Sequence, residues 1–257
     1  MRIAVCVKHA VDVSQLRMDS ATGKPLISTA PMKFNDLDRN ALEEAVRIKE
    51  KIGGSVIAIT FGGEKAREIL REALAMGADE AIQIVNDINV KPDTYITSQV
   101  LSEILKMKGP FDLILLGEMS IDSYSSQIGP RISEILNMPC ITYVRSIEVK
   151  NGKIKAQRDL EDRYELVEAE TPCIITVSRE INVPRLPPLM AILKASRKPI
   201  EKINLSSLKI DAEPKVLLID LKGLEVKRKN IVIKDKPVEE MVEELIQHLE
   251  KEGVLEG

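Results

Sequence analysis

One loop in the middle of the chain combines residue types that bind phosphate groups. It spans residues 117–130, follows a strongly apolar strand-like run and is rich in hydroxyl side chains. A helical pattern begins near Ser125, and a helix N-terminus offers free backbone N–H groups and a positive dipole end to a phosphate or pyrophosphate. The loop therefore favours a nucleotide-binding site. The alternative is that Ser125 and Ser126 only cap the helix, because serine is common at that position.

The other reactive residue types favour neither metal nor nucleophilic chemistry. The cysteines Cys6, Cys140 and Cys173 lie in apolar surroundings at wide, unequal spacing, which indicates small buried hydrophobic residues rather than disulfides or a zinc site. The two histidines, His9 and His248, have no paired metal-ligand spacing. A lone histidine after a strand is more often incidental than a proton donor. We therefore predict no catalytic residue and no metal ligand.

The two commonest phosphate-loop motifs are missing from the sequence. No G-x-G-x-x-G follows the first predicted strand, and no G-x-x-x-x-G-K-[ST] occurs. Neither a standard dinucleotide fold nor a P-loop ATPase is indicated. The nucleotide site must be of another kind.

Strand-like and helical patterns alternate over the first two-thirds of the chain, as in a parallel sheet covered by helices on both faces. The predicted strands are residues 3–7, 55–61, 81–85 and 112–116. The first predicted helix is capped by Asp36 or Asp38 and runs to residue 52, and the others are residues 62–76, 93–107 and a segment from 125 onward. This order predicts a doubly wound, mainly parallel α/β core. Ligands of such sheets bind beyond the carboxyl ends of the strands, so the loops after Val7, Phe61 and Leu116 should meet in one crevice.

After Asn137 the pattern changes to shorter strands and then to an arm. Strands are predicted at residues 143–149, 153–158 and 173–178, with a tight hairpin turn at Asn151 and Gly152. From Val183 the chain is rich in proline around a helical piece at residues 189–196, and residues 237–252 form an amphipathic helix that needs a surface to cover. We predict an α/β nucleotide-binding domain with a β-hairpin region at residues 1–182, and a recognition loop with a C-terminal arm at residues 183–257.

Charge and hydropathy disfavour two classes of partner. Lys and Arg number 37 against 40 Asp and Glu, so the net charge of -3 gives no electrostatic reason to expect nucleic acid. No stretch approaches the roughly 20 apolar residues that a bilayer span needs, and the N-terminus lacks the pattern of a signal peptide. We expect no nucleic acid, no direct membrane insertion and a cytoplasmic location.

Four blocks of the sequence carry a family resemblance. Three are short: residues 5–8 (Val-Cys-Val-Lys), residues 72–81 (Glu-Ala-Leu-Ala-Met-Gly-Ala-Asp-Glu-Ala) and the Ile121-Asp122 pair. The fourth is residues 158–167 (Arg-Asp-Leu-Glu-Asp-Arg-Tyr-Glu-Leu-Val), followed by Pro-Cys-Ile-Ile-Thr at residues 172–176. It is similar to a signature of a basic residue, an acidic pair, Glu, an aliphatic residue, Pro and aliphatic-Thr in fixed order. From residue 1 to about residue 200 the chain resembles the electron transfer flavoprotein β subunit.

The resemblance implies a Rossmann-like, adenine-nucleotide-binding topology and a heterodimer in which the α subunit holds a redox FAD, while a C-terminal arm and helix of this chain wrap the partner. In conventional members the β subunit binds a structural AMP. In electron-bifurcating members it binds a second FAD, which accepts a hydride from NADH. The binding residues implied by position are Cys6, Lys8, Asn35, Phe61, Gly62, Asp122, Ser125, Ser126, Gln127 and Gly129. Without the resemblance, Asn35 would be an ordinary helix-entry residue and Phe61 a core aromatic.

Within the family, the phosphate loop favours FAD over AMP. Members with AMP usually read Asp-x-x-x-Asn-Gln-Thr-Gly, whereas bifurcating members read close to Asp-x-x-Thr-Ala-Gln-Val-Gly-Pro. In this chain Ser125 keeps a hydroxyl, Ser126 is small where Asn would be bulky, and Ile128 cannot hydrogen-bond a terminal phosphate as Thr would. Tyr124 matches neither pattern. These residues leave room for a second phosphate.

The favoured interpretation is a β subunit whose FAD splits electrons from NADH between the α-subunit FAD and a low-potential acceptor such as ferredoxin. The first alternative is a conventional β subunit with structural AMP that relays electrons from dehydrogenases. The second is a stand-alone nucleotide-binding sensor or ATP-dependent enzyme of the same superfamily, against which the missing triphosphate loop argues.

The resemblance also assigns a role to Leu189. In this family the segment after Pro184 resembles a recognition loop, whose leucine docks in a pocket of a partner dehydrogenase or quinone oxidoreductase. A single exposed apolar anchor suits a transient encounter, because such interfaces are small. The alternative is that Leu189 and Leu193 pack the short helix of the arm onto the core.

Overall fold

Runs of β-branched and aliphatic residues form the buried parallel strands of the protein. In the computed structural model, which describes residues 1–150, 152–223 and 228–255, these strands are β1 (Arg2–Cys6), β4 (Ser55–Gly62), β5 (Glu80–Val85), β6 (Leu113–Gly117) and β10 (Cys173–Val177). They are joined by β7 (Cys140–Lys150), β8 (Lys153–Asp159), β9 (Tyr164–Glu170) and β11 (Glu201–Asn204). The nine-stranded sheet has the order β11-β5-β4-β1-β6-β10-β7-β8-β9. Pairing is parallel from β11 to β7, and antiparallel from β7 to β9.

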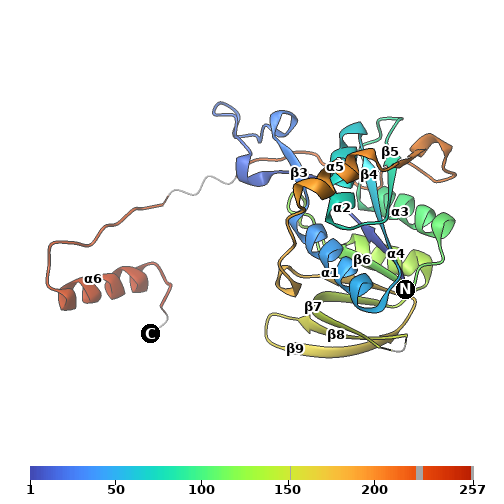
Figure 1. The fold of residues 1–257 in the computed structure, drawn as a ribbon. Coiled ribbons are helices and arrows are strands. Elements are labelled where there is room, and N and C mark those ends of the chain that lie inside the picture. The colour runs from blue at the N-terminus through green and yellow to red at the C-terminus, as the bar shows by residue number, and fades with distance from the viewer. Residues whose placement is uncertain (151, 224–227, 256–257) are drawn as a thin grey trace. The chain divides into compact units, whose positions relative to one another are not determined.

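Helices cover both faces of this sheet, which confirms the predicted doubly wound α/β fold (Figure 1). α1 (Asp36–Ile52) and α2 (Arg67–Met76) pack into one apolar core, and α3 (Thr94–Lys108) and α4 (Ile128–Leu136) into the other. Successive residues of β1 alternate between the cores, because side chains along a strand point to opposite faces. Val5 lies in the first core and Ala4 in the second. The central strands are therefore apolar throughout.

Several smaller elements complete the chain. β2 (His9–Val11) and β3 (Met32–Phe34) form a separate antiparallel pair. α5 (Leu189–Arg197) packs against α2, and α6 (Val238–Lys251) lies near the C-terminus. Short 3₁₀ helices span Val13–Gln15, Ile27–Thr29, Glu64–Ala66, Arg179–Ile181 and Leu205–Ser207.

The sequence analysis predicts none of β2, β3, β9 and β11. β9 alternates apolar and acidic residues, and its Glu168 and Glu170 lie opposite Lys155 and Lys153 of β8. Such a strand lacks a continuous apolar run, so its pairing partner has to be known before it can be recognised. β7 and β8 pair antiparallel, as the predicted hairpin requires, while Asn151 of its turn lies outside the described residues.

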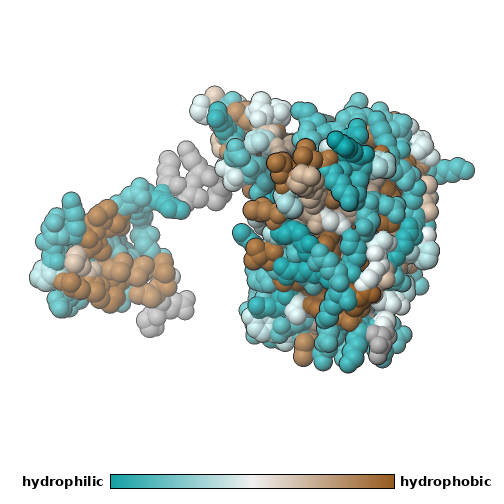
Figure 2. Space-filling model, viewed as in Figure 1, coloured by the Kyte–Doolittle hydropathy of each residue, from teal (hydrophilic) through white to brown (hydrophobic). Residues whose placement is uncertain are grey.

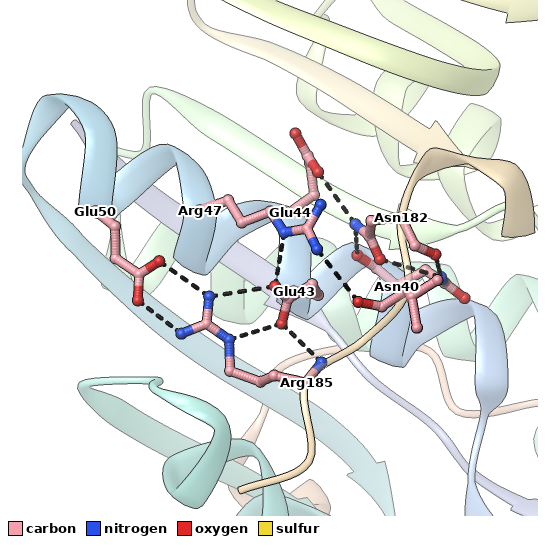
Figure 3. A network of polar contacts seen from close by, with 8 residues as sticks. Asn40, Glu43, Glu44, Arg47, Glu50, Asn182 and Arg185 are labelled. Carbon is pink, nitrogen blue, oxygen red and sulfur yellow. Dashed lines mark hydrogen bonds and ion pairs between the residues drawn. The ribbon is translucent and has the colours of Figure 1, made fainter.

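The proline-rich segment that follows β10 is tied to α1 by a polar network (Figure 3). The Arg185 guanidinium donates to Glu43 Oε2 at 2.8 Å and to Glu50 Oε1 at 2.6 Å. Asn182 and Asn40 exchange side-chain-to-backbone hydrogen bonds at 3.0 and 2.8 Å. The Glu43 side chain is only 3% exposed, so its charge depends on these partners. The segment that leads to α5 is thus fixed at its base.

The chain divides into two compact units, Met1–Leu221 and Lys222–Gly257. The first unit includes β11, which adds to the edge of the sheet beside β5. α6 belongs to the second unit, and one side of it carries the exposed apolar residues Val238, Val242 and Leu245 (Figure 2). Among the residues described, none of the helices combines the length and apolarity required to cross a bilayer.

Candidate functional site: a crevice at the switch point of the sheet

The carboxyl ends of β4, β1 and β6 lie next to one another in the sheet. From β1 the chain first builds β4 and β5 on one side, and then returns to build β6, β10 and β7 on the other side. The strand order therefore reverses between β1 and β6. In open α/β sheets the crevice outside such a switch point is the usual ligand site. The topology thus brings together the three loops that the sequence analysis expects to converge.

A buried carboxylate spans the switch point. Asp38 accepts the backbone N–H of Lys8, after β1, at 2.8 Å and the N–H of Gly117, at the end of β6, at 3.0 Å. The sequence analysis expects Asp36 or Asp38 to cap α1. The structure differs, because Asn35 occupies the N-cap position and Asp38 lies within the first turn, where its side chain reaches the strand ends. Asp38 therefore connects the ends of β1 and β6, and the sequence pattern does not predict this connection.

Asn35 holds the loop after β6 in place. Its Nδ2 donates to the carbonyl oxygen of Met119 at 3.0 Å, and its Oδ1 accepts the N–H of Ile121 at 3.0 Å. The residue is 1% exposed. Both ends of the amide therefore serve the loop, and Asn35 lies beneath the crevice as a support for residues 119–121.

Lys8 and Asp122 form an ion pair that joins the end of β1 to the loop after β6. The Nζ of Lys8 is 2.6 Å from Asp122 Oδ1 and 3.1 Å from Ser120 Oγ, while Asp122 Oδ2 accepts the N–H of Val11 at 3.2 Å. Burial by itself would raise the pKa of Asp122, but the ammonium and the hydrogen bonds outweigh it and leave the pKa below its usual value. Asp122 is therefore ionised at neutral pH, and the Lys8 side chain beside it is 44% exposed.

The turn between β6 and α4 presents backbone N–H groups. Tyr124 and Ser126 adopt left-handed φ values of 49° and 52°, and Gln127 follows in the right-handed helical region. Alternating handedness turns successive N–H groups to one side, a backbone arrangement that is able to bind anions. α4 begins at Ile128, three residues after the predicted Ser125, because the left-handed residues delay the helix. No side chain caps this end of α4 in the described structure, so the alternative in which Ser125 and Ser126 only cap it is wrong.

Gln127 ties the start of α4 to α3. Its Oε1 accepts hydrogen bonds from Thr94 Oγ1 at 2.8 Å and from Arg131 Nε at 3.1 Å. With the oxygen used in this way, the Nε2 group of Gln127 remains as a hydrogen-bond donor. The hydroxyls of Ser125 and Ser126 make no hydrogen bond to any residue that the structure describes.

The remaining predicted binding residues lie at the ends of the same strands. Cys6 is the last residue of β1, and burial raises the pKa of its thiol far above the usual value, so its side chain is neutral and part of the core. Phe61 and Gly62 end β4, with the Phe61 ring packed against the second core. Leu189 is apart from the crevice, at the start of α5, and is 70% exposed.

The polar groups around the crevice match a nucleotide better than a metal ion. Backbone N–H groups, two free hydroxyls and a lysine are donors for phosphate oxygens. Over the described residues, no three His, Cys, Asp or Glu side chains cluster as metal ligands would. Sequence reasoning did not assign Asp38, Ser120 or Thr94 to the site. Ser120 lies within the hydroxyl-rich loop at residues 117–130, and Asp38 is an acidic residue in the first turn of a helix that follows a strand, whereas Thr94 left no signal.

Replacement of Asp38 should change how stability depends on pH. Burial raises the pKa of Asp38 to about 7, although the two backbone N–H groups oppose it, so the folded chain binds this proton more tightly than the unfolded chain. As pH rises from about 4 to about 7, wild type should lose on the order of 2–4 kcal/mol of unfolding free energy relative to Asp38→Asn. Urea unfolding at several pH values measures the difference. Asp36→Asn, at a neighbouring carboxylate whose side chain is 45% exposed, is the control, and parallel curves for wild type and Asp38→Asn would contradict this role.

Comparison with known proteins identifies the family of this chain. A family model described as "Electron transfer flavoprotein domain" matches residues 26–208. The electron transfer flavoprotein subunit beta of Thermoanaerobacterium thermosaccharolyticum is 40% identical over 212 residues, which cover 82% of this chain and 81% of that protein. The subunit of the same name from Bacillus subtilis is 38% identical over 257 residues, 98% of this chain and 99% of that protein.

A relative from a larger complex is similar to the same degree. The caffeyl-CoA reductase-Etf complex subunit CarD of Acetobacterium woodii is 39% identical over 201 residues, covering 78% of this chain and 77% of that protein. The part matched by the family model includes the loop at residues 117–130 and the hairpin of β7 and β8. The chain belongs to the electron transfer flavoprotein β-subunit family.

Proposed function

We propose that the crevice at the switch point binds an adenine nucleotide, and that this nucleotide is FAD. The observation that carries the proposal is the turn before α4, where left-handed Ser126 and right-handed Gln127 orient N–H groups toward one side of an uncapped helix start. The Lys8 ammonium lies at the neighbouring strand end and offers a charge to the phosphates. The binding residues are Cys6 and Gly62 through their backbone, Lys8, Phe61, and the segment from Asp122 to Gly129, with Asn35 supporting the loop.

FAD is favoured over AMP by the shape of the turn. Ser126 has a small side chain in a left-handed conformation, where a larger residue would crowd a second phosphate. Ile128 packs against the second apolar core and offers no hydrogen bond to a terminal phosphate. When bound, the isoalloxazine supplies the hydride and single-electron chemistry, and the protein supplies position and electrostatics.

In this proposal the chain is the β subunit of a heterodimer. An FAD held by Lys8 and the segment from Asp122 to Gly129 would supply hydride acceptance from NADH and electron transfer to the FAD of the α subunit and to a low-potential acceptor such as ferredoxin. The complex works in the cytoplasm. The apolar side of α6 supports a role in binding the α subunit, because an amphipathic helix needs a surface to cover.

A conventional subunit with structural AMP is the alternative within the family. Relatives named as subunits of caffeyl-CoA reductase and acryloyl-CoA reductase assemblies are 39% and 34% identical to this chain, and their names identify electron transfer to reductases without naming the nucleotide. A stand-alone sensor has less support, because α6 and the apolar residues of α5 are exposed in the free chain.

The cofactors released from the purified heterodimer test the nucleotide assignment. The chain is co-expressed with its α partner, the complex is denatured, and the released nucleotides are separated and quantified. We expect two FAD per heterodimer and NADH-dependent bleaching of the flavin absorbance. One FAD and one AMP per heterodimer would establish the conventional alternative instead.

Leu189 is proposed as the anchor that docks in a partner dehydrogenase or quinone oxidoreductase. Exposed apolar residues gather over α5, among them Leu189, Met190 and Leu193, on a helix whose approach is fixed by Arg185 (Figure 2). Leu189→Ala should raise the KM for the partner by about tenfold or more without changing the nucleotide content, because a central apolar anchor contributes on the order of 2 kcal/mol. Ile88→Ala, which removes an exposed side chain in the loop after β5, should leave this KM unchanged. Equal KM values for the two variants would remove Leu189 from the docking surface.

A further inference from the structure

The first turn of α4 lies directly on one methyl group of the sheet. A Cβ added to Gly129 would be 2.3 Å from Cγ2 of Thr176 in β10, while the Cβ of Thr176 would be 3.8 Å away. Gly129 is buried and Thr176 is 2% exposed, so neither can move aside into solvent. The Thr176 methyl therefore sets how closely the start of α4 approaches the sheet.

A backbone irregularity holds Thr176 in this orientation. Its Oγ1 accepts the N–H of Tyr143 at 3.3 Å. Tyr143 has a left-handed φ of 56°, at the point where the register between β7 and β10 shifts. A bulky residue rarely adopts that conformation unless its surroundings impose it, and bulges of this kind re-aim groups beside functional sites. With its hydroxyl engaged on the β7 side, Thr176 directs its methyl toward α4.

The irregularity is itself held by the family signature. The Arg158 guanidinium donates through Nε to the carbonyl oxygen of Thr142 at 2.9 Å and through Nη2 to Thr142 Oγ1 at 3.1 Å. Its Nη1 donates to Glu165 Oε2 at 2.9 Å. Arg158 thus clamps the residue before Tyr143. The signature residues on β8 and β9 are connected by contacts, through Thr142, Tyr143 and Thr176, to the turn before α4.

We infer that Thr176 is a positioning residue for the nucleotide. Its methyl group sets how closely the phosphate-binding turn approaches the sheet, and Arg158 and Tyr143 hold that methyl group in place. The inference rests on the proposed nucleotide site and adds to it the residues behind the turn. Thr176 does not touch the ligand. It acts by placing the N–H groups of residues 126–129, whose effect on a phosphate depends on their position to within a fraction of an ångström.

A purely structural role for Thr176 makes a different prediction. If the contact only contributed to core packing, a folded variant would bind nucleotide as well as wild type. If the contact places the turn, a folded variant with a displaced turn loses affinity and regains it when the clash is removed. Nucleotide affinity in folded variants distinguishes the two roles.

The test is a double-mutant cycle on Gly129 and Thr176. Gly129→Ala adds a methyl against Thr176, and we expect it to weaken binding of FAD, or of AMP, by about tenfold or more. Thr176→Ser removes the clashing methyl and keeps the hydroxyl that accepts the Tyr143 N–H. The double variant Gly129→Ala, Thr176→Ser should regain an affinity within about threefold of wild type, since the two changes are coupled through one contact.

Isothermal titration of the full-length chain with FAD and with AMP gives the affinities, and circular dichroism with thermal unfolding shows that each variant is folded. Alanine is a better helix former than glycine, so the double variant should melt at or above the wild-type temperature. Wild-type affinity in folded Gly129→Ala, or a folded double variant that does not recover, would overturn the inference and leave the proposed function intact. A wild-type chain that binds neither nucleotide would overturn the proposed function, and the inference with it.

Discussion

The carboxylate of Asp38 is the contact on which the candidate site depends. It lies in the first turn of α1 and accepts N–H groups from the ends of β1 and β6, two strands between which the order of the sheet reverses. Burying this group is costly, and the two hydrogen bonds offset only part of the cost, as its raised pKa indicates. The same contact explains Gly117, where a Cβ would lie 2.7 Å from Asp38 Oδ1 and from Leu37 Cβ. Asp38 and Gly117 therefore fix the ends of β1 and β6 against the first turn of α1.

The second support of the site comes from the antiparallel part of the sheet. β7 pairs parallel with β10 on one side and antiparallel with β8 on the other, and its register shifts where Tyr143 turns left-handed. That shift allows one strand to serve the α/β core and the hairpin together. The contacts from Arg158 to Thr142, and from Tyr143 to Thr176, place the hairpin behind the turn that precedes α4. Asp38 of α1 and the contact between Tyr143 and Thr176 both act on the loop between β6 and α4.

The sequence patterns predict the central parallel strands, but they do not predict the contacts that hold the loop between β6 and α4. The strands at the centre are continuous apolar runs, so their existence and their order of alternation with helices are visible in one dimension. The contact of Asp38 with Gly117 joins residues 79 positions apart, and nothing local indicates it. The start of α4 was placed too early, because Ser125 looks like a cap while the left-handed Ser126 prevents the helix from beginning there. β9 is not predicted, because its alternating acidic residues indicate a strand only when the lysines of β8 that lie opposite them are known. Leu189, to which the family resemblance assigns a docking role, is 70% exposed, and that role stays a prediction.

Hydrogen exchange of the backbone amides, with and without FAD, tests the central claim most directly. If the switch-point crevice is the nucleotide site, added FAD should slow exchange in residues 117–131 and at the ends of β1 and β4, because the N–H groups before α4 become hydrogen-bonded and the surrounding loops open less often. α6 and the outer strands β8 and β9 should exchange as before in the free chain. Protection elsewhere with no change in residues 117–131, or no protection at saturating FAD and AMP, would contradict the account.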